Sequence, residues 1–260
     1  MKGTEMDDYQ QFVQRYKERT GLDLTLYKEK QMKRRLITLR DKLGFENFHD
    51  VITAISSDAS LEEMLSDKVT INVSEFYRNS DRWKELEERL LPQMMSERKR
   101  PIRIWSAACS TGEEPYTLAM ISERIRCKVQ ILATDIDQKV LNKAREATYK
   151  AHAIKQVPPD VLTLFFESND NEWRVQTKKL PPVTFDVHDL LRNDYPQGQD
   201  LIVCRNVCIY FTEEAKALVY KKFADALTSG GLLFVGSTEQ IFRPERYGLR
   251  HESSFFYRKL

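Results

Sequence analysis

The sequence has no cysteine pattern typical of a zinc site or a disulfide framework. Its 260 residues contain four scattered histidines and four cysteines, and no two cysteines form a Cys-x-x-Cys pair. A structural zinc ion needs closely placed thiolate or imidazole ligands, and disulfide-rich domains are short and secreted. We therefore expect reduced thiols and no metal. The cysteines are Cys109, Cys127, Cys204 and Cys208.

Long apolar stretches and a strong net charge are also missing. No run approaches the roughly 18 apolar residues of a membrane-spanning helix, and the N-terminus, MKGTEMDDYQ, has no apolar signal core. The 41 Lys and Arg residues nearly balance the 39 Asp and Glu residues, for a net charge of +2. We expect a soluble cytoplasmic protein with no membrane insertion, and the weak overall field gives no reason to expect nucleic acid as a partner.

The first hundred residues show the period of amphipathic helices and no convincing strand. Apolar residues recur at helical spacing in three segments, 9–16, 32–43 and 48–55. Gly21 and Gly44 stand where helix C-terminal glycines are common. Ser60 and Glu63 form a capping-box pattern before a fourth helix, and a fifth helix would span 83–94.

After Pro101 the pattern changes to short apolar runs separated by helices, which indicates a parallel sheet wrapped by helices. The expected strands are 102–107, 129–134, 183–187, 200–204 and 231–236. The polar stretch SERKR marks the boundary, so we expect a helical domain with its linker over 1–98 and an α/β domain over 99–260. Residues 151–182 contain two adjacent prolines and a polar run, and indicate either a small inserted β-rich lobe or an elaborated surface loop.

In an open parallel sheet a ligand sits beyond the carboxyl ends of the strands. The first strand is followed by ACSTGEEPY, whose small residues permit close backbone approach but which is not the GxGxxG of a dinucleotide site. Glu113 and Glu114 would repel a phosphate and would suit a ligand with a cationic group. Alternatively, they only cap the following helix. Which of the two would face the ligand is left open by the sequence.

The second and third strands end in further carboxylates. Asp135 comes 23 residues after Gly112, close to the ~20 expected for a residue that binds ribose hydroxyls. Asp137 competes for that role but could cap the next helix. Asp189 could accept a hydrogen bond from an adenine amino group or serve a turn. The spacing indicates a nucleotide-like ligand that also carries a cation.

The fourth strand runs into CRNVCIYF, an unusual combination of charge and aromatic rings at the end of a buried strand. Arg205 and Tyr210 would supply a guanidinium and a phenol where a substrate carboxylate could meet the ligand, and Asn206 lies beside them in the sequence. Alternatively, Arg205 only braces a carboxylate. The segment 237–239 follows the fifth strand and closes the set.

Five segments, in order, resemble the CheR family of chemotaxis receptor glutamate methyltransferases. They are INVSEFYR at 71–78, WSAACSTGEEPY at 105–116, ILATDID at 131–137, LIVCRNVCIYF at 201–211 and LLFVGSTEQIF at 232–242. The resemblance covers both expected domains. It implies an α/β fold with a Rossmann-like sheet of the kind found in methyltransferases that use S-adenosylmethionine (SAM), an all-α N-terminal domain and a small inserted β-subdomain.

The resemblance also implies a protein-glutamate O-methyltransferase. Such an enzyme transfers a methyl group from SAM to glutamate side chains of chemotaxis receptors for sensory adaptation, and releases S-adenosylhomocysteine. Glutamate has a pKa near ~4.3, so its carboxylate is already the nucleophile and the enzyme needs no general base. Arg205 and Tyr210 are similar to the family's pair around the transferred methyl group.

Cofactor contacts follow from the same resemblance. Arg78 would pair with the methionyl carboxylate, Glu113 with the amino group and Asp135 with the ribose. Asp189 and Leu190 would neighbour the adenine. The full set implied to bind SAM is Asn72, Ser74, Arg78, Glu113, Asp135, Asp189, Leu190, Arg205 and Asn206.

A basic helix is expected near the N-terminus, because residues 28–42 contain seven Lys or Arg against two acidic residues. On a helical wheel Lys30, Lys33 and Arg34 lie opposite the apolar face. That face is either merely solvated or, as the resemblance implies, docks the acidic methylation region of the receptor. Some relatives also tether to a receptor's C-terminal peptide through the β-subdomain. Here the segment FFESNDNEWRV lacks their glycine-rich loop, which argues against tethering.

Three other functions fit the sequence less well. A non-catalytic SAM sensor would not need Arg205 and Tyr210. A nicotinamide oxidoreductase would show GxGxxG after the first strand. A nucleic-acid methyltransferase would normally show a motif of the NPPY type where this chain has CRNV.

Overall fold

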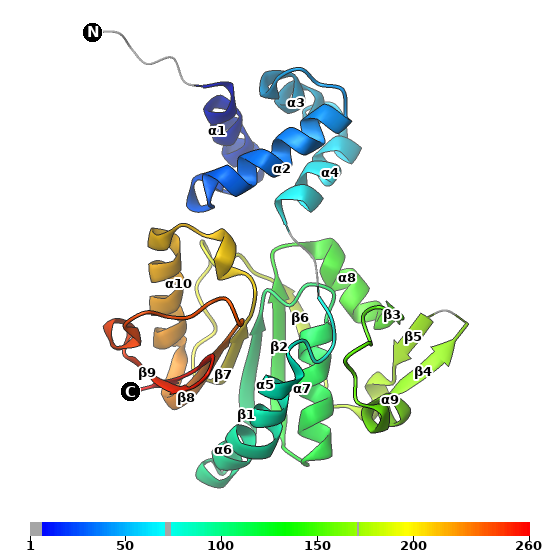
Figure 1. Cartoon of the computed structure of the whole chain (residues 1–260), viewed down its shortest axis with the longest axis vertical. Helices are drawn as coiled ribbons and strands as arrows, with labels where there is room; N and C mark the ends of the chain where they lie inside the picture. Colours follow the sequence, from blue (N-terminus) through cyan, green and yellow to red (C-terminus); the bar gives the residue numbers. More distant parts are fainter. Residues whose placement is uncertain (1–6, 71–73, 171) are drawn as a thin grey trace. The chain divides into compact units, whose positions relative to one another are not determined.

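The computed structural model describes residues 7–70, 74–170 and 172–260, which form two compact units (Figure 1). The helical unit consists of Met1–Ile71 together with Tyr210–Lys216. The sheet unit consists of Asn72–Ile209 and Ala217–Leu260. A short segment from the second half of the sequence therefore makes its contacts with the first seventy residues. Each unit is described by itself.

The helical unit is a bundle of four helices, which confirms the expected all-α domain. The helices are α1 (Asp8–Thr20), α2 (Glu29–Lys42), α3 (Phe48–Ile55) and α4 (Ala59–Val69), with a short 3-10 helix η1 (Leu24–Leu26) after α1. Their apolar faces meet in one core, in which Phe12, Leu36 and Ile55 are each 1% exposed. Burial of these faces stabilises helices that are too short to persist alone in water.

The helix ends in this unit follow from local side-chain chemistry. Gly21 ends α1 in the left-handed conformation at φ 77°, as its position in the sequence predicts. The capping box expected at Ser60 is wrong. Asp58 is the N-cap of α4, and its carboxylate accepts hydrogen bonds from the backbone N–H groups of Ser60 and Leu61. An earlier carboxylate takes this role because its negative charge also complements the positive end of the helix.

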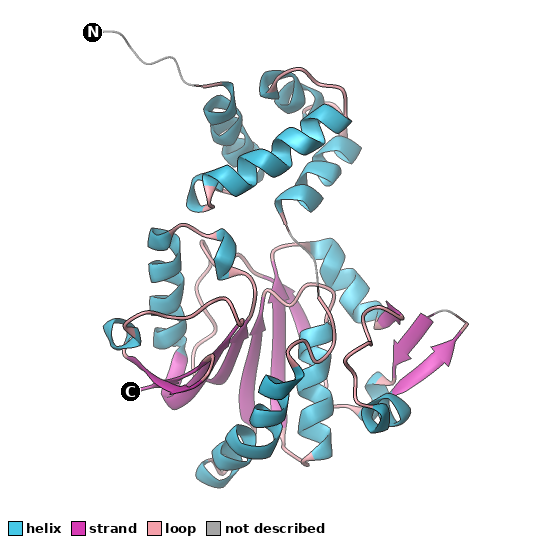
Figure 2. Ribbon diagram, viewed as in Figure 1, coloured by secondary structure: helices cyan, strands magenta, loops and turns pink. Residues whose placement is uncertain are grey.

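The sheet unit is built on a seven-stranded, mostly parallel sheet in the order β6-β2-β1-β7-β8-β10-β9 (Figure 2). The parallel strands are β1 (Ile102–Ala107), β2 (Val129–Asp135), β6 (Val183–Val187), β7 (Gln199–Cys204) and β8 (Leu227–Val235). These are the five strands expected from the sequence, and the expected α/β methyltransferase fold is confirmed. Two antiparallel strands, β9 (Leu249–Ser253) and β10 (Phe256–Lys259), extend the β8 edge and were not expected.

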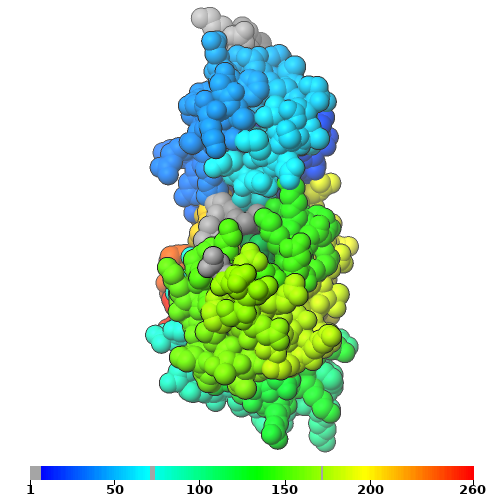
Figure 3. All heavy atoms as spheres, turned by 90° about the vertical axis from the view of Figure 1, so that its right-hand side faces the viewer, coloured from blue at the N-terminus to red at the C-terminus, as the bar shows by residue number. Residues whose placement is uncertain are grey.

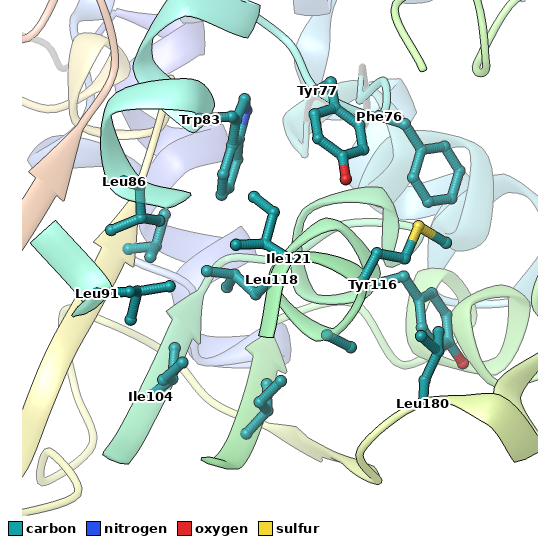
Figure 4. Close-up of a cluster of buried hydrophobic side chains, with 14 of the residues drawn as sticks. Phe76, Tyr77, Trp83, Leu86, Leu91, Ile104, Tyr116, Leu118, Ile121 and Leu180 are labelled. Atoms are coloured by element: carbon teal, nitrogen blue, oxygen red, sulfur yellow. The ribbon is translucent and has the colours of Figure 1, made fainter. Parts of the chain in front are cut away.

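Helices cover both faces of this sheet, and neighbouring residues of β1 point to opposite faces. Ile104 belongs to a buried cluster with Leu118 and Ile121, and Figure 4 labels all three. Trp105 packs edge-on against Phe223 of α10 at a ring distance of 5.5 Å on the other face. The helices of this part of the chain are α5 (Ser80–Glu85), the π-helical turn η2 (Leu86–Leu90), α6 (Leu91–Glu97), α7 (Glu113–Arg124), α8 (Gln138–Glu146) and α10 (Glu213–Ala226).

A small lobe carries its own three-stranded antiparallel sheet, which confirms the expected β-subdomain. Its strands lie in the order β3-β5-β4, and Figure 3 shows the lobe on the face turned toward the viewer. The elements are β3 (Thr148–Lys150), α9 (Pro159–Phe165), β4 (Phe166–Asn169) and β5 (Glu172–Val175). Three more 3-10 helices complete the chain: η3 (Thr177–Lys179), η4 (Cys208–Tyr210) and η5 (Pro244–Tyr247).

Three properties of the described residues bear on function. No helix among them has both the length and the apolar character to cross a membrane. Within the same ranges, no group of three or more His, Cys, Asp or Glu side chains is arranged to hold a metal ion. The four cysteines are buried and free, and burial raises the pKa of Cys127 to about 11.

Candidate functional site

The loop after β1 is held in a strained conformation at the carboxyl edge of the parallel strands. Ala108 and Ser110 adopt left-handed φ angles of 61° and 50°. For residues with a side chain this costs of order 1–3 kcal/mol each, and such strain concentrates at functional sites. Gly112, at φ 95°, leads into α7, and an added Cβ there would lie 2.8 Å from Cβ of Ala144. The loop therefore passes where larger residues do not fit.

Glu113 and Glu114 begin α7 and point to different partners. The side chain of Glu113 is buried and accepts hydrogen bonds from Thr111 at 2.7 and 2.9 Å, and another from the hydroxyl of Ser74. Glu114 accepts a hydrogen bond from Ser106 at 2.8 Å and lies 3.9 Å from a guanidinium nitrogen of Arg205. Burial raises the pKa of Glu114 to about 7, although Arg205 opposes this shift. Glu114 is therefore the carboxylate beside the arginines.

Asp135 ends β2, and its side chain accepts hydrogen bonds from two backbone segments. Its two carboxylate oxygens accept hydrogen bonds from the backbone N–H groups of Ser110 at 2.8 Å and Asp137 at 3.0 Å. Burial raises the pKa of Asp135 to about 6, against the effect of these donors. Asp137 caps α8 by accepting from the backbone N–H of Lys139, which is its alternative role from the sequence. Of the two carboxylates, Asp135 is thus the one that faces the strained loop.

The segment after β6 carries Asp189 and Leu190. Asp189 is half-buried and accepts a hydrogen bond from the backbone N–H of Leu191 at 2.8 Å, which is a turn role. Leu190 is buried. The preceding residue, His188, donates its backbone N–H to the carbonyl of Asp135 at 2.9 Å. This bond brings the ends of β2 and β6 together, so that the expected ribose and adenine residues are neighbours.

Arg205 follows β7 and joins two parts of the site. One guanidinium nitrogen donates to the backbone carbonyl of Arg78 at 2.6 Å and to the side chain of Asn79 at 2.9 Å. The guanidinium also stacks on Trp83 and Phe234, at 5.1 and 4.8 Å from the ring centres. Burial lowers its pKa, while Glu114 raises it. The carboxylate contact that the sequence left open exists, because Arg205 lies at ion-pair distance from Glu114, and Arg205 also holds the backbone of Arg78.

Arg78 lies in a segment that the small lobe holds in place. Its neighbour Phe76 is fully buried and packs edge-on against Tyr149 of β3 at 4.8 Å and Phe166 of β4 at 5.1 Å. The backbone N–H of Phe76 donates to the carbonyl of Ala153 at 3.0 Å. Asn72 lies outside the described residues. The lobe therefore does more than decorate the surface, because it fixes the segment that carries Ser74 and Arg78.

Glu239 received no role from the sequence, yet it organises the turn after β7. Its buried carboxylate accepts hydrogen bonds from the backbone N–H groups of Asn206 at 2.6 Å, Val207 at 2.9 Å and Gly236 at 2.8 Å. Asn206 is left-handed at φ 62°. An added Cβ at Gly236 would lie 2.5 Å from the Glu239 carboxylate, so only glycine fits. The available signal was the run VGSTEQ directly after a strand.

Two of the buried polar atoms that lack a hydrogen-bond partner among the described residues bear on the candidate site. They are Nε of Arg205 and the hydroxyl oxygen of Ser110. An unsatisfied buried polar group costs about 1–3 kcal/mol, so its presence in a native protein calls for an explanation such as a functional role or a bound water or ion. Both follow parallel strands, where ligands bind in folds of this class. The donors and carboxylates here suit a molecule that has a carboxylate, an ammonium group and ribose hydroxyls, which are the groups of SAM.

The remaining expected residues belong to the helical unit. Tyr210 lies in Tyr210–Lys216, so its placement relative to Arg205 stays a prediction. Lys30 and Arg34 of α2 are exposed. Lys33 forms an ion pair with Asp7 at 2.7 Å and lies over the ring of Tyr9 at 4.9 Å. Part of the expected basic face is thus neutralised within the unit.

Comparisons with known proteins cover nearly the whole chain. Residues 72–255 match the family described as CheR methyltransferase, SAM binding domain, and residues 7–70 match the CheR methyltransferase all-alpha domain. The chain is similar to a chemotaxis protein methyltransferase of Listeria monocytogenes, with 41% identity over 97% of both chains. It is 33% identical to a chemotaxis protein methyltransferase of Borreliella burgdorferi over 85% of this chain and 83% of that one. With chemotaxis protein methyltransferase 1 of Pseudomonas aeruginosa the identity is 30%, over 87% of this chain and 88% of that one.

Proposed function

The chain belongs to the CheR methyltransferase family, and from that premise we propose that it esterifies glutamate side chains of chemotaxis receptors in the cytoplasm. As a member of that family it is a SAM-dependent methyltransferase. The finer statements concern the substrate residue, the site residues and the place of action. The observation that supports glutamate as the substrate residue is the buried Arg205, whose Nε has no partner among the described residues at the end of β7.

The cofactor contacts of this proposal use the residues at the carboxyl edge. Arg78 pairs with the methionyl carboxylate, Asp135 with the ribose, and Asp189 and Leu190 lie beside the adenine. For the amino group we assign Glu114 in preference to Glu113. Thr111 donates to both carboxylate oxygens of Glu113, whereas Ser106 donates to only one oxygen of Glu114, Oε1, which leaves the other for the ligand. Ser74 and Asn206 line the same site, and Asn72 joins them on the strength of family resemblance alone.

Chemistry at this site depends on placement more than on charge. Bound SAM supplies an electrophilic methyl group on a positively charged sulfur atom. The opposite charges of sulfonium and carboxylate vanish in the products, so strong stabilisation of either charge would favour the ground state over the transition state. One guanidinium nitrogen of Arg205 is committed to the carbonyl of Arg78 and the side chain of Asn79. Its Nε, which has no partner among the described residues, is left to orient one oxygen of the substrate. Tyr210 lines the methyl pocket, and the enzyme gains its rate by holding the groups in line.

Docking on the receptor uses the exposed charges of α2. Lys30 and Arg34 are exposed and basic, while Lys33 contributes less because Asp7 pairs with it. A basic face of this kind speeds association with an acidic partner and makes the rate depend on salt.

The test is incubation of the purified protein with radiolabelled SAM and receptor-containing membranes. We expect label on the receptor that mild alkali releases, because methyl esters hydrolyse and N-methyl groups do not. Heat-inactivated protein serves as the control. Alkali-stable label, or no label above that control, would rule the proposal out.

A further inference from the structure

The segment after β7 is fastened to the helical unit by its backbone. The N–H of Lys28 donates to the carbonyl of Tyr210 at 2.8 Å, and the N–H of Thr212 donates to the carbonyl of Leu26 at 2.9 Å. Tyr27 and Phe211 form an antiparallel bridge, and their rings meet edge-on at 5.2 Å. Two short stretches that are far apart in the sequence therefore behave as one piece of structure.

The ring of Tyr210 has a further partner on α2. The guanidinium of Arg35 lies over this ring, 4.8 Å from its centre. Both side chains are half-buried, which strengthens a cation–π contact relative to a fully exposed one. Lys28 fixes the backbone of Tyr210, but that bond leaves the side chain free to rotate. Arg35 holds the ring itself.

We propose that Arg35 is a positioning residue for Tyr210 in methyl transfer. This inference rests on the proposed function, in which Tyr210 lines the methyl pocket. A tyrosine ring that changes rotamer cannot keep the methyl group and the attacking carboxylate in line, and small misplacements are costly in reactions that depend on orientation. α2 then has two tasks on different side chains. Lys30 and Arg34 attract the receptor, and Arg35 keeps the reaction pocket in shape.

A docking role for Arg35 would look different in kinetics. A residue that only attracts the receptor changes KM for the receptor and the salt dependence, and leaves kcat at saturating receptor unchanged. A residue that holds Tyr210 lowers kcat and leaves KM for the receptor nearly unchanged, because the orientation of the ring matters only once the substrate is bound.

The experiment measures kcat and KM for the full-length chain with receptor-containing membranes. For Arg35→Ala we expect kcat to fall on the order of tenfold, as loss of a partly buried cation–π contact allows, with KM for the receptor within about twofold of the parent. Arg35→Lys keeps the charge without the flat guanidinium and should be intermediate. Lys42→Ala removes a charge from the same helix at an exposed position and should leave kcat unchanged. If Arg35→Ala does not fold, the proposal is tested with Arg35→Lys, whose kcat should lie below that of the parent.

A double-mutant cycle with Tyr210→Ala tests whether Arg35 acts through the ring. We expect Arg35→Ala to reduce kcat little further once Tyr210 is alanine. Full additivity of the two losses would overturn the proposal, as would a raised KM for the receptor with normal kcat in Arg35→Ala. Failure of the proposed function is distinguishable, because the parent protein itself would then give no alkali-labile label on the receptor.

Discussion

The carboxylate of Glu239 accepts a hydrogen bond of 2.6 Å from the backbone N–H of Asn206, which stands in the left-handed conformation. This contact joins the end of β8 to the turn that carries Arg205. The same carboxylate accepts from Val207 and Gly236, so one side chain satisfies several buried donors. A buried acceptor of this kind stabilises a turn whose backbone angles are unfavourable in isolation.

Removal of this acceptor should therefore affect stability and activity together. For Glu239→Ala we expect the free energy of unfolding to fall by about 3 kcal/mol, since several buried N–H groups lose their partner. Glu239→Gln retains one good acceptor and should lose less. Urea denaturation measures the change, and methyl transfer should slow in the same order. Glu245→Ala, at an exposed position in the same region, is the control. A Glu239→Ala protein as stable as this control would contradict the account.

Affinity for SAM should depend on pH through Glu114. Burial raises the pKa of this carboxyl to about 7 in the ligand-free protein, and only the ionised form attracts an amino group. Below pH 7 binding must first remove a proton, so affinity should fall by about tenfold per pH unit and should level off above pH 7. Calorimetry between about pH 6.5 and 8 avoids deep titration of Asp135, whose pKa is about 6, and over this range the affinity should change by about fourfold.

The variant Glu114→Gln separates this effect from other titrations. It should bind SAM weakly and with little pH dependence over the same range, because it cannot ionise. Glu123→Gln, an exposed residue of the same helix, should keep the slope of the parent. A slope that survives in Glu114→Gln would assign the titration elsewhere.

Charge reversal on α2 should weaken receptor methylation in a salt-dependent manner. We expect Lys30→Glu with Arg34→Glu to raise KM for the receptor by on the order of tenfold at low salt and by much less at high salt, where charges are screened. The value of kcat should stay near that of the parent. Lys99→Glu with Lys128→Glu reverses two exposed charges that precede β1 and β2, and should change neither KM nor kcat. If both double variants changed KM for the receptor equally, the basic face of α2 would have no specific docking role.

Asp200 should be a strong determinant of stability. It is fully buried in β7 and pairs with Arg98 at 2.7 Å and Arg100 at 2.6 Å. Burial alone would raise its pKa, but hydrogen bonds led by those of Arg100 and Arg103 hold the pKa below the usual value. For Asp200→Asn we expect a loss of about 3 kcal/mol, the low end for a broken buried pair because Arg100 is half exposed.

The pH dependence of stability gives a second check on Asp200. A depressed carboxyl pKa stabilises the fold above the ordinary value near ~3.9, and this stabilisation is lost as pH falls through the lower folded-state value. The parent should therefore lose stability in acid more steeply than Asp200→Asn. Asp225→Asn at the exposed surface should follow the parent. Parallel acid profiles for Asp200→Asn and the parent would count against the assignment.

The sequence predicts this fold well where periodicity is strong. The helices and the five parallel strands come from runs such as LIVC, which is apolar enough to be buried on both faces of a sheet. The antiparallel strands β9 and β10 were missed because Arg250, His251 and Arg258 break the apolar pattern. Arg258 is buried through ion pairing with Glu252, which no spacing rule reveals.

At the site, the ends of the predicted strands show which side chains lie close together, but not the role of each one. Glu113 and Glu114 are chemically identical in the sequence, and only the fold shows that Glu114 lies beside Arg205. The role of Glu239 depends on a turn 33 residues earlier in the chain, and contacts at such separation leave no local pattern. Lys33 looked free on a helical wheel, which cannot show Asp7 from another helix.

The attachment of Tyr210–Lys216 to the first seventy residues has a consequence for how such proteins can be recombined. A chimera that exchanged only the N-terminal helices would pair Phe211 with a foreign residue in place of Tyr27. The seam between the two modules therefore runs through the second half of the chain as well as through the linker. A recombined protein, natural or engineered, has to take Tyr210–Lys216 from the same parent as the N-terminal helices. These seven residues are encoded far from the rest of the helical unit.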